Sequence, residues 1–140
     1  YLAIKNLEDR QFKKAVLVLT TGMNIFLFIS FVWPTGLNLR EGIVYDLHTL
    51  SGNLLKFVQT VDTPKSVFPS MHVYVTLVLQ YTLEMQKKLV PSWGIWVGRV
   101  LAVLIVLSTM FTKQHSVLDV SAAIVMFAVL VVVVEKIVKK

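Results

Sequence analysis

The sequence predicts an all-α fold, a polytopic transmembrane helical bundle with four visible spans and a short amphipathic surface helix. Of its 140 residues, 56% are hydrophobic and 16% are charged, and the mean hydropathy is +0.71. Soluble domains carry about 25% charged and 45–50% apolar residues. The apolar residues also gather in long stretches, with most basic residues between them. This composition argues against a soluble enzyme and a disordered segment, and the length predicts one domain over residues 1–140.

Four apolar stretches are the predicted spans. They cover residues 15–33, 68–84, 93–111 and 117–134. A bilayer core needs about 20 helical residues at about 1.5 Å each, and the first, third and fourth stretches meet this length. The second stretch is shorter and more polar, since it contains Ser70, His72, Thr76 and Gln80. We expect it to cross the membrane as well.

Between the first two spans, residues 42–61 predict a surface helix. Apolar residues recur there at roughly helical spacing, at Ile43, Leu47, Leu50, Leu54, Leu55 and Val58. We expect this amphipathic helix to lie along the outer membrane surface, with Gly52 as a break. Asp62, Thr63 and Pro64 then turn the chain toward the second span.

The basic residues predict the orientation, because cytoplasmic connections are enriched in Lys and Arg. If all four stretches cross, one side receives Lys5, Arg10, Lys13, Lys14, Lys87, Lys88, Lys136, Lys139 and Lys140. The other side receives Arg40, Lys56, Lys65 and Lys113. Both ends of the chain are therefore predicted to be cytoplasmic. The lipid bilayer also accounts for the net charge of +6, so no nucleic-acid partner is expected.

Pro69, Ser70 and His72 open the second span on the predicted outer side. A proline suits the first turn of a helix, whose free N–H groups attract an anion. Ser70 adds a hydroxyl donor, and His72 can act as a general acid or base because histidine changes its charge near neutral pH. Taken alone, this pattern more often describes a helix cap beside an interfacial histidine.

A second polar cluster, between the third and fourth spans, contains Lys113, His115 and Asp119. His115 and Asp119 are four residues apart and would share one face of a helix, where the carboxylate can hold one imidazole nitrogen. Asp119 heads an otherwise apolar span, and ionisable groups at such depth are functional by default. If the spans bundle, both clusters meet around a tetrahedral anion, with the donors, nucleophile and acid that phosphoryl transfer needs.

These residues resemble the type 2 phosphatidic acid phosphatase superfamily of integral-membrane phosphatases and phosphotransferases. Residues 68–72 (FPSMH) are similar to its second motif, P-S-G-H, with Met71 at the glycine. Residues 108–119 have the spacing of its third motif, S-R-x-x-x-x-x-H-x-x-x-D. The form found here is similar to a subgroup that includes inositol-phosphoceramide-synthase-like proteins.

The resemblance implies a role for each matching residue. His115 would take the phosphoryl group as a phosphohistidine, and Asp119 would orient it. His72 would protonate the leaving alcohol, and Ser70 would bind a phosphate oxygen. No cofactor and no metal would be required.

The chain also departs from the family pattern. Thr109 stands at the arginine of the third motif, so Lys113 is expected to bind phosphate in its place as a point charge. Of the first motif, K-x-x-x-x-x-x-R-P, only Arg40 is in place, and it too is expected to bind phosphate. The family core has six spans, so with Tyr1 in place of Met this chain is expected to lack two N-terminal helices.

The sequence therefore predicts a membrane lipid-phosphate phosphatase whose active site faces outside. One alternative keeps the site but transfers the group to an alcohol, as a phospho-head-group transferase. The other is a catalytically weak protein that binds lipid phosphate, which the altered first motif and Thr109 favour. A zinc site of His72, His115 and Asp119 is disfavoured by the charge of Lys113. The lipid substrate and the oligomeric state are left open.

Overall fold

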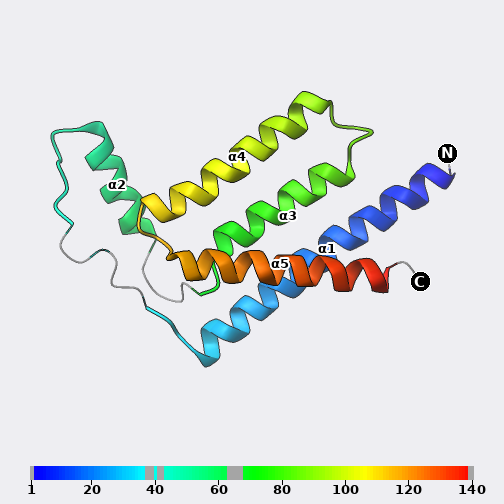
Figure 1. The fold of residues 1–140 in the computed structure, drawn as a ribbon, viewed down its shortest axis with the longest axis horizontal. Coiled ribbons are helices and arrows are strands. Elements are labelled where there is room, and N and C mark those ends of the chain that lie inside the picture. The colour runs from blue at the N-terminus through cyan, green and yellow to red at the C-terminus, as the bar shows by residue number, and fades with distance from the viewer. Residues whose placement is uncertain (1, 37–39, 41–42, 63–67, 139–140) are drawn as a thin grey trace.

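The computed structural model describes residues 2–36, 40, 43–62 and 68–138, which include five helices (Figure 1). The helices are α1 (Leu2–Val32), α2 (Leu50–Val61), α3 (Met71–Met85), α4 (Ser92–Phe111) and α5 (Val117–Ile137). The all-helical class predicted from the hydropathy pattern is confirmed for this part of the chain.

Three of these helices are long and apolar enough to cross a membrane. They are the segment Asp9–Val32 of α1, all of α4 and all of α5. The predicted spans at 15–33, 93–111 and 117–134 match them closely. The prediction at 68–84 corresponds to α3, which has only 15 residues. At about 1.5 Å per residue, α3 reaches about 22 Å, short of a hydrocarbon core of about 30 Å. The structure therefore supports a multi-pass membrane protein with three candidate spans.

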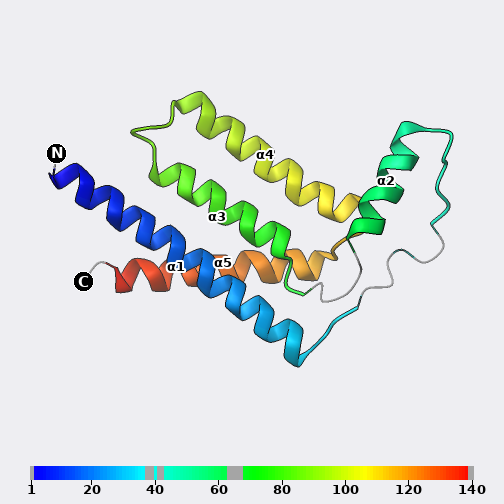
Figure 2. The same cartoon turned by 180° about the vertical axis from the view of Figure 1, so that it is seen from behind.

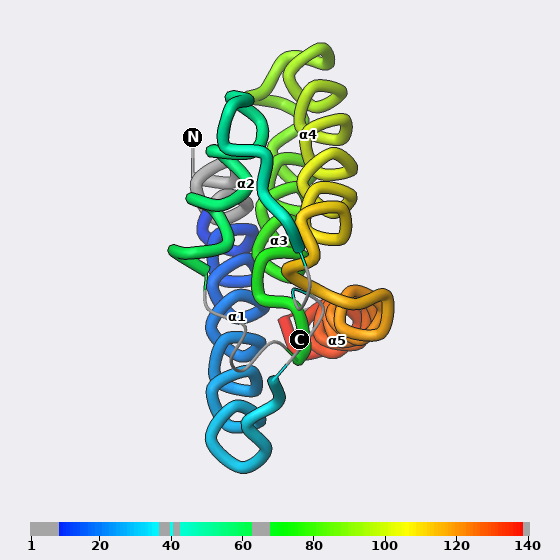
Figure 3. The backbone as a smooth tube through the Cα atoms, turned by 90° about the vertical axis from the view of Figure 1, so that its left-hand side faces the viewer, coloured from blue at the N-terminus to red at the C-terminus, as the bar shows by residue number. Residues whose placement is uncertain are grey.

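The short helix α3 nevertheless has the central place in the bundle. It packs against α1, α4 and α5, and α1 also packs against α5. Viewed from the end that carries α2, α3 lies between α1 and α4 (Figure 3). The beginning of α1, the end of α5 and the α3–α4 connection lie at one end of the bundle, and α2 and the α4–α5 turn lie at the other (Figures 1 and 2).

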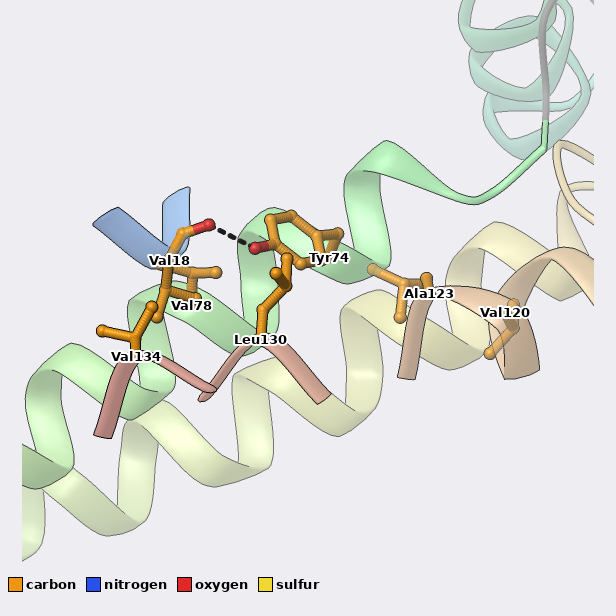
Figure 4. Packing of buried hydrophobic residues seen from close by; sticks show 8 residues of the cluster. Val18, Tyr74, Val78, Val120, Ala123, Leu130 and Val134 are labelled. Atoms are coloured by element: carbon orange, nitrogen blue, oxygen red, sulfur yellow. Dashed lines mark hydrogen bonds between the residues drawn. The ribbon is translucent and has the colours of Figure 1, made fainter. Parts of the chain in front are cut away.

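The core joins α1, α3 and α5 (Figure 4). Its buried side chains include Val18, Tyr74, Val78 and Leu130, and the Tyr74 hydroxyl donates a hydrogen bond to the carbonyl oxygen of Val18. A Cβ atom at Gly22 would overlap the Tyr74 ring. Glycine at this position thus lets α1 and α3 approach closely around a buried phenol.

The surface helix is shorter than predicted. The expectation of a helix over residues 42–61 is wrong for residues 43–49, because α2 begins at Leu50, where the Thr49 side chain accepts a hydrogen bond from the backbone N–H of Gly52. Residue 42 lies outside the described residues. Gly52 is also no break, since it lies in the first turn of the helix. The helix is amphipathic: an exposed apolar stripe faces away from the bundle and contains Leu50, Leu54, Phe57 and Val61.

Charged side chains tie the helices together at the end opposite α2. Lys14 of α1 forms a 2.6 Å ion pair with Glu135 of α5, and the Tyr81 hydroxyl of α3 donates to the same carboxylate at 2.7 Å. Arg99 of α4 pairs with Glu84 of α3 at 2.7 Å. These contacts neutralise charges near the ends of apolar helices, where an unpaired charge is costly.

Candidate active site

Two histidines from different helices meet at the end of the bundle that carries α2. The Nδ1 atom of His72, in the first turn of α3, lies 3.3 Å from the Nε2 atom of His115, just before α5. The ring centroids are 5.6 Å apart, and the rings are tilted by 58°. His115 is buried, whereas His72 is exposed. The structure therefore brings together the two residues predicted as nucleophile and proton donor.

Ser70 fixes the beginning of α3. It is the N-cap of the helix and accepts a hydrogen bond from the Val73 N–H at 3.4 Å. The prediction that Pro69 lies in the first helical turn is wrong, because this cap starts the helix two residues later, at Met71. The Ser70 N–H donates to the carbonyl oxygen of Asp119 at 3.2 Å, which binds the start of α3 to the start of α5. Ser70 is fully buried, so its role as a phosphate ligand stays a prediction.

Ser116 and Asp119 form a capping box at the start of α5. The Asp119 carboxylate accepts from the N–H of Ser116 at 2.7 Å and from its hydroxyl at 2.8 Å. The prediction that His115 and Asp119 share one helical face is wrong, since Ser116 caps the helix and leaves His115 outside it. Both residues are buried beside this cap. An orienting role for Asp119 stays a prediction.

His115 belongs to a tight turn that closes α4. The backbone N–H groups of Gln114 and His115 both donate to the carbonyl oxygen of Thr109, at 3.0 and 3.1 Å. Lys113 in this turn has a φ of 54°, a left-handed conformation that is rare outside glycine and asparagine. Its side chain is exposed. The turn thus exposes the Lys113 side chain to solvent and holds His115 in a buried position.

Arg40, predicted as a phosphate ligand, contacts the end of α2 and the α4–α5 turn. Its Nη2 atom lies 3.1 Å from the Asp62 carboxylate, and its Nη1 atom donates to the carbonyl oxygens of Gln59 and Asp62. Its Nε atom donates to the carbonyl oxygen of Lys113 at 3.4 Å. A phosphate at Arg40 would have to compete with Asp62 for the guanidinium, so phosphate binding here also stays a prediction.

Thr109, at the position of the family arginine, does not face solvent. It is buried, and its hydroxyl donates to the carbonyl oxygen of Val106 one turn earlier in α4. This side chain supplies neither a charge nor an open donor to the site.

The residues that join α2 to the α4–α5 turn were not among those predicted from the sequence. The Gln59 amide accepts from the Tyr45 hydroxyl at 2.6 Å and donates to the carbonyl oxygen of Thr112 at 2.7 Å. The Gln114 amide donates to the Asp62 carboxylate at 2.9 Å. The sequence carried no signal for the burial of Gln59, because a glutamine opposite the apolar stripe of a surface helix is expected to face water.

Among the described residues, no three His, Asp or Glu side chains lie together as a metal site would need. That the activity requires no metal stays a prediction, which an assay with a chelator would test. Comparisons with protein-family models, with curated proteins and with solved structures found no significant match for the chain.

Proposed function

We propose that this protein is a membrane lipid-phosphate phosphatase that works through a phosphohistidine on His115. The observation that carries the proposal is the contact between His72 and His115, which are 43 residues apart in the chain and 3.3 Å apart at their ring nitrogens. The polar neighbourhood supports it as well, since the capped starts of α3 and α5 are bonded to each other beside the pair.

The two imidazoles fit the two roles. If His72 is the imidazolium, its Nδ1–H faces His115 Nε2, whose lone pair can attack phosphorus. A nucleophile acts from about 3–3.5 Å, and the acid must reach the leaving oxygen on the far side of the phosphorus. The 3.3 Å gap between the two nitrogens is too narrow for a phosphoryl group to lie between them. Because His72 is exposed, its ring can swing outward as the phosphate enters.

The proposed reaction then has two steps. His115 Nε2 forms a bond to phosphorus while the ester P–O bond breaks, and the His72 imidazolium gives one proton to the leaving alkoxide and becomes a neutral imidazole. A water molecule next attacks phosphorus, the N–P bond breaks, and the water proton returns to His72. Lys113, exposed in the adjacent turn, would stabilise the negative charge of the phosphoryl oxygens.

The surroundings of the site support a lipid phosphate as the substrate. The pair lies at the same end of the bundle as α2, whose apolar stripe is free to enter the membrane interface. A lipid whose phosphate is at that depth can reach His115 without leaving the bilayer. We propose that this end lies outside the cell, because the start of α1, the α3–α4 connection and the end of α5, which carry most of the basic residues, lie at the other end (Figure 1). This orientation requires α3 to act as a fourth span, its short length being accommodated by local thinning of the bilayer.

The test is phosphate release from detergent-solubilised protein with phosphatidic acid, a lysolipid phosphate and a polyprenyl pyrophosphate, in the presence of a chelator. We expect release from at least one substrate and its loss in His115→Asn. A protein that releases phosphate only when an alcohol acceptor lipid is added would be the transferase instead. Release that stops with chelator and returns with a divalent metal would contradict the proposal.

Two observations favour the binding alternative. Thr109 is buried at the position of the family arginine, and Arg40 is engaged by Asp62. Both would weaken the binding of the phosphoryl group during its transfer. A protein of this kind would retain a lipid phosphate through solubilisation and release no product from it.

A further inference from the structure

We propose that α2 acts as a clamp on the α4–α5 turn, and that Gln59 and Asp62 are positioning residues for His115. The catalytic part of this inference rests on the function proposed above. Its structural part concerns only where the His115 side chain is held, and it can be tested without any substrate.

Three consecutive residues directly before His115 are each bonded to the segment that contains α2 or to Arg40 beside it. The carbonyl oxygen of Thr112 accepts from the Gln59 amide at 2.7 Å, and that of Lys113 accepts from Arg40 at 3.4 Å. The Gln114 side chain donates to Asp62 at 2.9 Å. Such a run of contacts fixes the path of the backbone that leads into His115.

Gln59 is the central member of this clamp. The residue is 8% exposed, which is unusual for a glutamine on a surface helix. Because the Tyr45 hydroxyl donates to its Oε1 atom, the amide is oriented with its Nε2 atom toward Thr112. A buried amide with a partner on each side holds its place more firmly than an exposed one, since losing either bond leaves a buried polar group unpaired.

Asp62 closes the clamp from the end of α2. Its carboxylate accepts from both Arg40 and Gln114, and the Arg40 guanidinium also bonds to the Gln59 carbonyl oxygen. Asp62 therefore couples the end of α2 to Arg40 and to the turn. In this arrangement Arg40 stabilises the clamp, a different role from the phosphate ligand predicted from the sequence.

The consequence for His115 follows from the turn itself. The N–H of His115 is held by the carbonyl oxygen of Thr109, so the residues between them form a small closed loop. A shift of Thr112 or Gln114 moves this loop, and with it the imidazole that faces His72. A misplacement of about 1 Å can cost about 100-fold in rate.

The test uses the absence of cysteine from the sequence. His115→Cys gives a protein with a single, buried thiol, whose rate of labelling by a small maleimide reports how tightly the turn is held. We expect Gln59→Leu in this background to raise the labelling rate at least fivefold. Gln59→Glu should do the same, because it keeps an acceptor for Tyr45 but loses the donor to Thr112. Thr60→Val is the matched control, since the Thr60 hydroxyl bonds only to Lys56 of its own helix in the described structure.

Turnover is the second readout, measured with His115 intact. Gln59→Leu should lower kcat about 10- to 100-fold with little change in KM, and Thr60→Val should leave both unchanged. Gln114→Leu breaks the clamp from the side of the turn and should reproduce the effect if Gln59→Leu does not fold. An unchanged labelling rate in the folded Gln59 and Gln114 variants would overturn the clamp. Faster labelling in a protein that shows no turnover even with His115 intact would support the clamp and reject the phosphatase.

Discussion

Among single residues, Asp119 has two tasks that substitutions can separate. The observed task is structural, because its carboxylate completes the capping box with Ser116. The predicted task is to orient the His115 imidazole. Asp119→Asn keeps an acceptor for the Ser116 N–H but removes the charge, whereas Ser116→Ala removes the cap and keeps the charge.

We therefore expect opposite effects from these two variants. Ser116→Ala should lower stability by about 1 kcal/mol, seen as a lower melting temperature, with turnover nearly unchanged. Asp119→Asn should change the melting temperature less and lower kcat by at least about 100-fold. If Asp119→Asn keeps turnover as high as Ser116→Ala does, Asp119 only caps α5.

At Lys113, too, a substitution can separate the charge of the side chain from the cost of the left-handed backbone. Its left-handed backbone costs a residue with a side chain about 1–2 kcal/mol, which glycine avoids. Lys113→Gly should therefore melt at the same or a higher temperature and yet raise the KM for a lipid phosphate at least about fivefold, because one cation is lost. Lys56→Gln, which removes an exposed lysine from α2, should leave KM unchanged. A KM unaffected by Lys113→Gly would exclude Lys113 from phosphate binding.

At the scale of helices, the contact between α1 and α3 depends on Gly22. Because a Cβ there would overlap the Tyr74 ring, Gly22→Ala should destabilise the bundle by about 1–3 kcal/mol. The neighbouring Thr21→Ala, at an exposed position, should have little effect. Thermal unfolding in detergent measures both. A smaller side chain at position 74, as in Tyr74→Leu, should recover part of the loss when combined with Gly22→Ala, and full additivity would contradict the contact.

Helix identity could be predicted from sequence wherever the apolar stretch was long. The spans near 15–33, 93–111 and 117–134 follow from hydropathy alone because a bilayer needs a fixed length. The start of α2 could not be predicted this way, since Ile43 and Leu47 continue the apolar spacing and only the Thr49 cap ends it. The central place of α3 was equally hidden, because it depends on which helices pack together.

The same contrast holds for the candidate site. The motif spacing pointed to His72 and His115 as neighbours, and their rings do meet. It gave no sign of Tyr45, Gln114 or the ion pair of Asp62 with Arg40, because these contacts join segments whose spacing follows no local pattern. Long-range polar contacts of this kind depend on the tertiary fold.

For the whole molecule, the orientation in the membrane depends on whether α3 crosses. His48, before α2, and Lys88, after α3, are both exposed, and the chain has no cysteine of its own. In intact cells, an impermeant maleimide should label His48→Cys directly and Lys88→Cys only after permeabilisation. Labelling of both from the same side would mean that α3 does not cross, and would reverse the predicted side of either the site or the termini.

The proposed mechanism passes through a covalent intermediate on His115, which rapid quenching during turnover of phosphorus-labelled phosphatidic acid would trap. We expect an acid-labile, base-stable label on the peptide that contains His115, present in the wild-type protein and absent from His115→Asn. His72→Asn should lose turnover by at least about 100-fold while its His115 stays able to accept the group from a substrate with a better leaving group. Turnover without a label, or an acid-stable label on another residue, would contradict a phosphohistidine at His115.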